Sequence, residues 1–330
     1  DLVSSRGLGD VYKRQLTTLE FMKFFKSLPF GIVACLTGDQ TTGTSLIKNR
    51  KVKIVSFTGS ASTAKTIYEN CAKLFKPCHL EGGGSDTMVI SNKTDINFAA
   101  KAAITSSFHL SGQICTSTEH LLIHENIYEK FKNLFVKKMS ELKVGDGLAK
   151  NEIGPVANSK TFNKANNIIS DALKHGANVI YHKDHKVIMR KKGYFIPPTL
   201  IENINSKMIC NKEEIFAPIV TISKYRNIKN VVKSVNKSEF GLGFNLISND
   251  LSENLYLAEN IETGLFWSNN PLIDNDALSF GGIKKSGIGR ELGKIGLDTF
   301  RNTKMVVIDP EQKIHDWWYP YSEKQLKQFN

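Results

Sequence analysis

The pattern of apolar and polar residues along the chain predicts strands and helices in alternation. Short apolar or alternating runs predict strands at residues 31–36, 53–57, 79–81, 87–90, 120–123, 178–181, 199–201, 220–224 and 304–308. Apolar residues at helical spacing predict helices at residues 16–27, 44–48, 63–75, 96–109, 125–141, 162–175, 227–236 and 252–261. This alternation predicts an α/β fold with a largely parallel sheet.

The beginning of the chain differs from the rest. Residues 1–15 have no apolar period and join abruptly to the helix pattern that starts at Leu16. We therefore expect residues 1–15 to be a non-native leader and exclude them from the fold prediction. Because the sequence has no initiator Met, we also expect the natural N-terminus to lie outside it.

Length, composition and charge narrow the class of protein. A chain of 330 residues with 41% hydrophobic and 23% charged residues is typical of a globular protein with room for two domains. No apolar run approaches the roughly 18 residues of a membrane span. The net charge of +12 comes from lysines dispersed among Asn, Glu and Asp. We therefore expect neither nucleic acid nor a membrane as partner.

The cysteines and histidines do not indicate a disulfide framework or a metal site. The five cysteines form no CxxC pair. His120 and His124 lie on a predicted strand, where their rings would be too far apart to share a metal ion. Cys78 and His79 are neighbours on another strand and would point to opposite faces. With no signal peptide recognisable, we expect the cytoplasm.

Two glycine-containing segments follow predicted strands. Phe57–Ser60 stands where a strand meets a helix, and a helix N-terminus suits a phosphate. An ordinary capped turn explains the same residues, and the local pattern alone favours it. Glu81 is followed by three glycines, which would let a ligand approach and leave the carboxylate able to act as a base. A glycine-rich turn after a strand is also a common structural feature.

Cys115 follows an apolar helix and Gly112, a setting that exposes a side chain at a turn. A thiolate is a strong nucleophile, although an isolated cysteine is more often a small buried apolar residue. Two further segments, Glu213–Pro218 and Phe280–Glu291, are candidates either for the lining of a pocket or for ordinary loops.

The order of these segments resembles that of the NAD(P)-dependent aldehyde dehydrogenase superfamily. The resemblance covers nearly everything after Leu16. Five motifs stand in the family's order and at plausible spacing: Phe57–Ser60, Leu80–Gly84, Gly112–Cys115, Glu213–Pro218 and Phe280–Glu291. This agreement is far more specific than any of the motifs alone.

The resemblance implies catalytic roles for two residues. Cys115 would attack the aldehyde carbon, and the resulting thiohemiacetal would lose hydride to the nicotinamide and become a thioester. Glu81 would activate the water that hydrolyses this thioester. The backbone N–H of Cys115 would contribute to oxyanion stabilisation.

The resemblance also implies a cofactor site. Gly59 and Ser60 would face the pyrophosphate, Glu214 would bind the nicotinamide ribose, and Phe216 would lie against the nicotinamide. Gly83 is assigned to the same site. The cofactor would be NAD or NADP, with NAD favoured.

The implied fold has a partial Rossmann-type cofactor domain and an α/β catalytic domain. Their expected ranges are 16–82 and 83–282. Residues 283–330 would return across the cofactor domain, and Lys304–Ile308 would add a strand to an oligomerisation sheet. A homodimer or homotetramer is therefore expected.

The sequence departs from the family pattern in several places. Single-residue departures occur at Ala64, Gly82, Ser85 and Ala217. The family's N-terminal part, which includes an oxyanion-hole Asn, is not found, so we expect the 330-residue polypeptide to be inactive or poorly folded. Losing one oxyanion donor costs roughly 100- to 1000-fold in rate. Two alternatives stay open, a CoA-acylating aldehyde dehydrogenase and a non-catalytic homologue, and the aldehyde itself is not indicated.

Overall fold

The computed structural model describes residues 17–315 and 317–327. The predicted leader, residues 1–15, lies outside the described residues. The chain divides into two units, residues 1–299 and 300–330, and each is described by itself.

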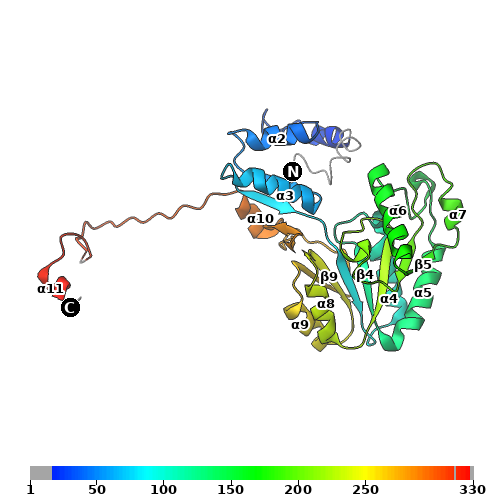
Figure 1. The fold of residues 1–330 in the computed structure, drawn as a ribbon. Helices are drawn as coiled ribbons and strands as arrows, with labels where there is room; N and C mark the ends of the chain where they lie inside the picture. Colours follow the sequence, from blue (N-terminus) through cyan, green and yellow to red (C-terminus); the bar gives the residue numbers. More distant parts are fainter. Residues whose placement is uncertain (1–16, 316, 328–330) are drawn as a thin grey trace. The chain divides into compact units, whose positions relative to one another are not determined.

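A seven-stranded sheet forms the centre of the first unit (Figure 1). Its order is β10 (Leu265–Ser268), β9 (Gly243–Ile247), β3 (Asp86–Ile90), β4 (Thr118–His124), β7 (Ile219–Tyr225), β6 (Thr199–Glu202), β5 (Asn178–Tyr181). All neighbouring strands are parallel except β5 and β6. The predicted α/β fold with a largely parallel sheet is therefore confirmed.

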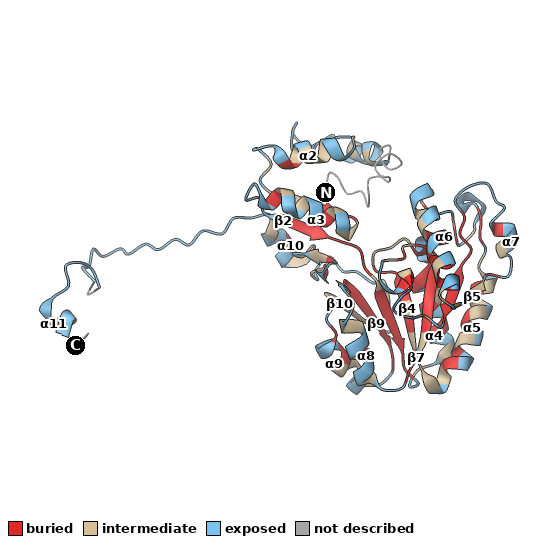
Figure 2. Cartoon of the chain, in the orientation of Figure 1, coloured by how far each residue is buried: buried red, intermediate tan, exposed pale blue. Residues whose placement is uncertain are grey.

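Helices cover both faces of this sheet, as its buried strands require. The main ones are α4 (Ile96–Phe108), α5 (Tyr128–Glu141), α6 (Ser159–Lys174), α8 (Ile228–Asn236) and α9 (Leu251–Asn260); α7 (His185–Ile188) is a single turn. Met88 and Ile90 of β3 join a core with Phe131 of α5, whereas Val89 between them joins a core with Val231 of α8. Alternate residues of β3 thus reach the two faces, and all of its residues are buried. Figure 2 shows buried residues along the central strands of the sheet.

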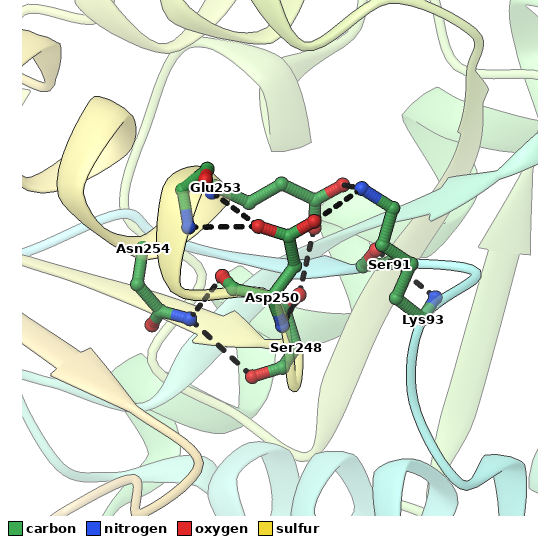
Figure 3. A network of polar contacts seen from close by, with 7 residues as sticks. Ser91, Lys93, Ser248, Asp250, Glu253 and Asn254 are labelled. Carbon is green, nitrogen blue, oxygen red and sulfur yellow. Dashed lines mark hydrogen bonds and ion pairs between the residues drawn. The ribbon is translucent and has the colours of Figure 1, made fainter.

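A polar network fixes α9 to the carboxyl ends of β3 and β9 (Figure 3). Asp250 caps α9 by accepting from the N–H groups of Ser252 and Glu253. Lys93, just after β3, forms ion pairs with Asp250 and Glu253. Ser248 donates to Glu253 Oε2 at 2.7 Å. Capping and ion pairing together define where this helix begins.

A second sheet has the order β1 (Val55–Thr58), β2 (Cys78–Glu81), β12 (Gly287–Ile288). Helix α3 (Ala61–Ala72) connects β1 to its parallel neighbour β2, and α2 (Gln40–Lys48) contacts α3. Strand β12 returns antiparallel to β2, and β11 (Ile283–Lys284) pairs with β8 (Phe240–Gly241). The chain passes from β2 to β3 through residues 82–85, so this short link joins the two larger sheets. The domain boundaries at residues 82 and 282 stay a prediction.

The strand predicted at residues 31–36 is wrong, and the strand predicted at Lys304–Ile308, which was expected to pair with a partner subunit, is not formed within the single chain. Residues 31–36 form turns and irregular backbone, and Ile32 and Leu36 are exposed. Lys304–Ile308 is assigned no strand, and its apolar side chains are exposed. A strand requires a neighbour that satisfies its backbone groups, and no described strand pairs with either segment. The predicted helix at 16–27 is also shorter: residues 17–21 are helical and Met22–Phe25 form a 3₁₀ turn.

The second unit has little regular structure. Its described residues contain one short helix, α11 (Glu323–Leu326), which follows the aromatic residues Trp317, Trp318, Tyr319 and Tyr321. The indole rings of Trp317 and Trp318 meet edge to face with their centroids 6.0 Å apart. No helix in the described part of the chain is long and apolar enough to cross a membrane.

Candidate active site

Three separate chain segments meet the glycine run that follows β2. A Cβ atom on Gly82 would lie 2.6 Å from the backbone oxygen of Lys285, and one on Gly84 would lie 2.3 Å from the backbone oxygen of Cys115. A Cβ atom on Gly83 would lie 2.4 Å from the carboxylate of Glu214. The absence of side chains on these residues therefore lets the Cys115 and Glu214 segments approach the link after Glu81.

Glu81 and Cys115 are consequently brought into one region. Three residues of chain span at most about 11 Å, which limits how far the Cα of Glu81 lies from that of Gly84. Gly84 in turn contacts the Cys115 backbone. A side chain at position 82 would require the Lys285 backbone to shift, so the glycine found there fits its surroundings.

Cys115 lies in a turn between α4 and β4, and is partly exposed. The backbone before it is strained, because Leu110, Ser111 and Gly112 have left-handed φ values of 49°, 60° and 67°. A Cβ atom on Gly112 would lie 2.3 Å from the backbone oxygen of Ala217. The structure thus presses the cysteine turn against the loop that carries Glu214, and strain of this kind is typical of functional sites.

Glu81 is the last residue of β2, and only 3% of it is exposed. Its Oε1 lies 3.1 Å from His79 Nε2, whereas Oε2 is buried with no hydrogen-bond partner among the described residues. Burial raises the pKa of Glu81 above its ordinary value, and the hydrogen bond with His79 opposes this rise. A carboxylate in this environment is suited to general-base catalysis.

Glu214 is positioned by its neighbours. The N–H of Gly84 donates to Glu214 Oε1 at 3.3 Å, and Lys164 Nζ donates to the Glu214 backbone oxygen. Glu119, buried at the start of β4, accepts from the N–H groups of Ile215 and Phe216 at 2.7 and 2.8 Å. Glu119 therefore fixes the turn that presents Glu214, with Phe216 at a left-handed φ of 53°.

The sequence analysis missed two buried carboxyls near this turn. Burial, followed by the charge of Glu214, raises the pKa of Glu119 to about 8. Burial also raises the pKa of Asp86 to about 8, although Asp86 accepts from the N–H of Gly243. The only sequence signal was their position at the start of β4 and β3, where a charged residue interrupts an apolar strand.

These two carboxyls predict a dependence of stability on pH. The folded protein holds both protons up to about pH 8, whereas the unfolded carboxyls lose theirs near the ordinary values of 3.8 and 4.5. Their contribution to the free energy of unfolding is complete below the pKa values of the unfolded state. It falls as the pH rises above them and is lost as the pH passes through about 8. The double variant Asp86→Asn/Glu119→Gln should lose less unfolding free energy between pH 5 and 8 than the wild type. The difference should be at least about 1.4 kcal/mol, which corresponds to a shift of one pKa unit. Urea unfolding at both pH values measures it; equal losses in both proteins would contradict the assignment.

A cavity of about 750 Å³ opens beside this region. Ser60, which precedes α3, and Tyr68 of α3 line it together with Phe240 and Ile288. Five lysines and three glutamates also line it: Lys65, Lys164, Lys212, Lys284, Lys285, Glu213, Glu214 and Glu239. A helix N-terminus, a surplus of cationic side chains and a carboxylate suit a ligand with phosphate and ribose groups.

The predicted cofactor residues differ in their placement. Ser60 lines the cavity and caps α3, where its Oγ accepts from the N–H of Thr63 at 3.3 Å. Gly59 is not among the lining residues; its N–H donates to the Glu81 backbone oxygen at 2.9 Å, and a Cβ would lie 2.4 Å from the Phe57 ring. Gly83 and Phe216 are also not in the lining, although both adjoin Glu214.

The histidine weighed as a metal ligand has other partners. His120 bonds Ser85 Oγ at 2.9 Å and Thr221 Oγ1 at 2.8 Å, and burial lowers its pKa to about 4. Within residues 17–315 and 317–327, no group of three or more His, Cys, Asp or Glu side chains is placed to hold a metal ion.

Comparison with known proteins shows what the chain is similar to. The model of the aldehyde dehydrogenase family matches residues 12–306. The chain is 32% identical over 312 residues to the peroxisomal aminoaldehyde dehydrogenase 1 of Pisum sativum, covering 93% of this chain and 62% of the relative. It is 32% identical over 284 residues to the NADP(+) succinate-semialdehyde dehydrogenase GabD of Escherichia coli (strain K12), covering 85% and 58%. The chain thus spans about three fifths of the length of these relatives.

Solved structures of aldehyde dehydrogenases are also similar to this chain. The NAD+ complex of an aldehyde dehydrogenase from Bacillus cereus is similar with a TM-score of 0.85 and 30% identity, covering 90% of this chain and 60% of that one. The betaine aldehyde dehydrogenase of Staphylococcus aureus in complex with NAD+ has a TM-score of 0.84 and 28% identity, covering 92% and 61%.

Proposed function

The chain belongs to the aldehyde dehydrogenase family, and from this premise we propose that the complete protein oxidises an aldehyde to a carboxylic acid with NAD(P)+. We assign the nucleophile to Cys115 and the general base to Glu81. The observation that carries this proposal is the convergence of Cys115 and Glu214 on the glycines that directly follow Glu81.

The proposed reaction divides between these two residues. The Cys115 thiolate forms a C–S bond to the aldehyde carbon, and the carbonyl oxygen becomes an oxyanion. A nicotinamide cofactor held by the cavity residues would supply the acceptor for the hydride that leaves this carbon, and the oxyanion would then re-form the C=O bond of a Cys115 thioester. Glu81 then takes a proton from water as the oxygen attacks the thioester carbon, the C–S bond breaks, and the acid departs. The strained turn before Cys115 holds the thiol at this position.

The residues of the cavity fit the cofactor. Ser60 and the first N–H groups of α3 would bind the pyrophosphate, with Lys65 on the same helix. Glu214, held by Gly84 and the turn fixed by Glu119, would accept from the ribose hydroxyls. Gly59 would contribute by letting β1 turn into α3, and Gly83 by leaving space for Glu214. Phe216, in the same turn, would lie against the nicotinamide.

A substitution of Gly83 tests the cofactor assignment. Gly83→Ala would place a methyl group within 2.4–2.6 Å of the Glu214 carboxyl atoms, so Glu214 must move. We expect the Kd for NAD(P)+ to rise at least about tenfold, the equivalent of one lost charged hydrogen bond. Gly43→Ala is the matched control, because a Cβ atom there meets nothing within 4 Å. Titration calorimetry of both variants decides it, and an unchanged Kd in Gly83→Ala would remove Glu214 from the cofactor site.

Hydrolysis is favoured over transfer to CoA because Glu81 is present and its Oε2 has no hydrogen-bond partner in the part of the chain that the structure describes. The test is to follow NADH or NADPH absorbance with a panel of aldehydes, with and without CoA, on the complete protein. Production of reduced cofactor and free acid supports the proposal. Acyl-CoA as the product would favour the acylating alternative, and no turnover with cofactor bound would favour a non-catalytic homologue.

Three finer assignments are part of the proposal. We propose NAD over NADP; relatives with names of both cofactor types occur. We propose a homodimer or homotetramer, supported by the exposed apolar side chains of Lys304–Ile308, which a partner's sheet edge would cover. We propose the cytoplasm, where a reducing environment would keep the Cys115 thiol available.

A further inference from the structure

His79 and Glu81 form a buried pair on one face of β2. They are two residues apart on a strand, so their side chains point the same way. The two residues are 1% and 3% exposed. His79 Nε2 lies 3.1 Å from Glu81 Oε1, close enough for a hydrogen bond.

The surroundings of the His79 ring fix its orientation. Ser56 on β1 stands opposite His79 in the strand register, and its Oγ lies 3.2 Å from His79 Nδ1. Glu291 approaches the same nitrogen at 3.6 Å from a partly exposed position. A Cβ atom on Gly289 would lie 2.7 Å from His79 Cδ2, so the backbone of that loop closes over the ring.

This arrangement treats the two carboxylate oxygens of Glu81 differently. Oε1 is held by His79, whereas Oε2 is buried and has no hydrogen-bond partner among the described residues. We propose that His79 is a positioning residue, which holds Oε1 so that Oε2 is the oxygen that takes the proton from water. The role in catalysis rests on the proposed function, but the hold on Glu81 does not.

The charged groups around Glu81 set the direction of the expected effect. Besides burial, Glu291 raises the pKa of Glu81, while Arg290 lowers it. The hydrogen bond from His79 is the largest influence that lowers it. Removing this donor should therefore raise the pKa of Glu81 further, and a neutral donor in its place should restore part of the difference.

The test is a titration of the Glu81 carboxyl in the complete protein. Infrared difference spectra against Glu81→Gln isolate the band of the protonated carboxyl in wild type, His79→Leu and His79→Gln. We expect the midpoint to move up by about one pH unit, a tenfold change in the protonation equilibrium, in His79→Leu. His79→Gln, which retains an N–H donor, should lie between the two. The same midpoint in all three proteins would overturn the proposal, even if His79→Leu is less stable.

A kinetic measurement separates this inference from the proposed function. The rate of thioester hydrolysis, measured after a single turnover, should begin to fall on the acid side at a higher pH in His79→Leu than in the wild type. A purely structural role for His79 would lower the rate equally at all pH values and would contradict the inference. If the wild type oxidises no aldehyde, the proposed function fails, while the infrared titration still decides whether His79 holds Glu81.

Discussion

A Cys115→Ala variant of the complete protein is expected to lose at least about a thousandfold in kcat for aldehyde oxidation. Without Sγ no carbon–sulfur bond can form, so both the hydride-donating adduct and the thioester are lost. Losses of an enzyme's nucleophile reach about a millionfold elsewhere, and the remaining rate reflects the oxyanion hole and substrate binding. The strained backbone around Gly112 does not depend on the thiol, so the fold and cofactor binding should persist.

The matched control is Cys35→Ala. Cys35 lies in irregular backbone outside the two main sheets, so its loss should leave turnover unchanged. NADH or NADPH absorbance measures both variants. If Cys115→Ala retained more than a tenth of the wild-type activity while Cys35→Ala was unchanged, covalent catalysis by Cys115 would be excluded.

A Glu81→Gln variant should be slowed by about 100- to 10,000-fold in steady-state turnover, the usual contribution of a general base. Glutamine keeps the shape of the side chain and still accepts from His79, but it cannot take a proton from water. The first equivalent of reduced cofactor should form at a rate close to wild type, because hydride transfer precedes hydrolysis. Rapid mixing would then show a burst followed by a slow steady phase.

The pH dependence of the wild type gives a second test of Glu81. Since burial raises the pKa of Glu81, hydrolysis should decline on the acid side at a higher pH than an ordinary glutamate would give. Glu141→Gln, an exposed change on α5, is the control and should alter neither rate nor profile. A Glu81→Gln enzyme that reaches steady state at the wild-type rate would assign the base elsewhere.

The sequence was sufficient for the elements whose signal is local. β3 and α4 follow from apolar period alone, and their observed bounds differ from the predicted ones by a residue. Residues 31–36 and Lys304–Ile308 have equally good strand patterns, yet neither forms a strand. Strand formation depends on a pairing edge far away in sequence, which an apolar run cannot report. The two-residue strands β11 and β12 are too short to produce any period.

In the candidate site, too, the features with a local sequence signal were predicted and those that depend on distant segments were not. Motif order made Cys115, Glu81 and Glu214 candidates. Glu81 ends β2 before a glycine run and Cys115 lies in a turn after Gly112, whereas Glu214 was indicated only by the order of the motifs. His79 was considered only together with its neighbour Cys78, which points to the opposite face, whereas its hydrogen-bond partner Glu81 is two residues further on. The i, i+2 spacing with Glu81 was the available signal. The roles of Glu119 and Asp86 depend on burial and on backbone N–H groups from distant segments, and no sequence pattern contains these.

The central claim, that Cys115 carries the substrate as a thioester, can be measured directly. The complete protein with Glu81→Gln is mixed with NAD(P)+ and an aldehyde that the wild type oxidises, quenched in acid, digested and analysed by mass spectrometry. We expect the peptide containing Cys115 to gain the mass of the acyl group, in proportion to the burst of reduced cofactor. A burst of the same size with the acyl group on another residue, or on none, would contradict it.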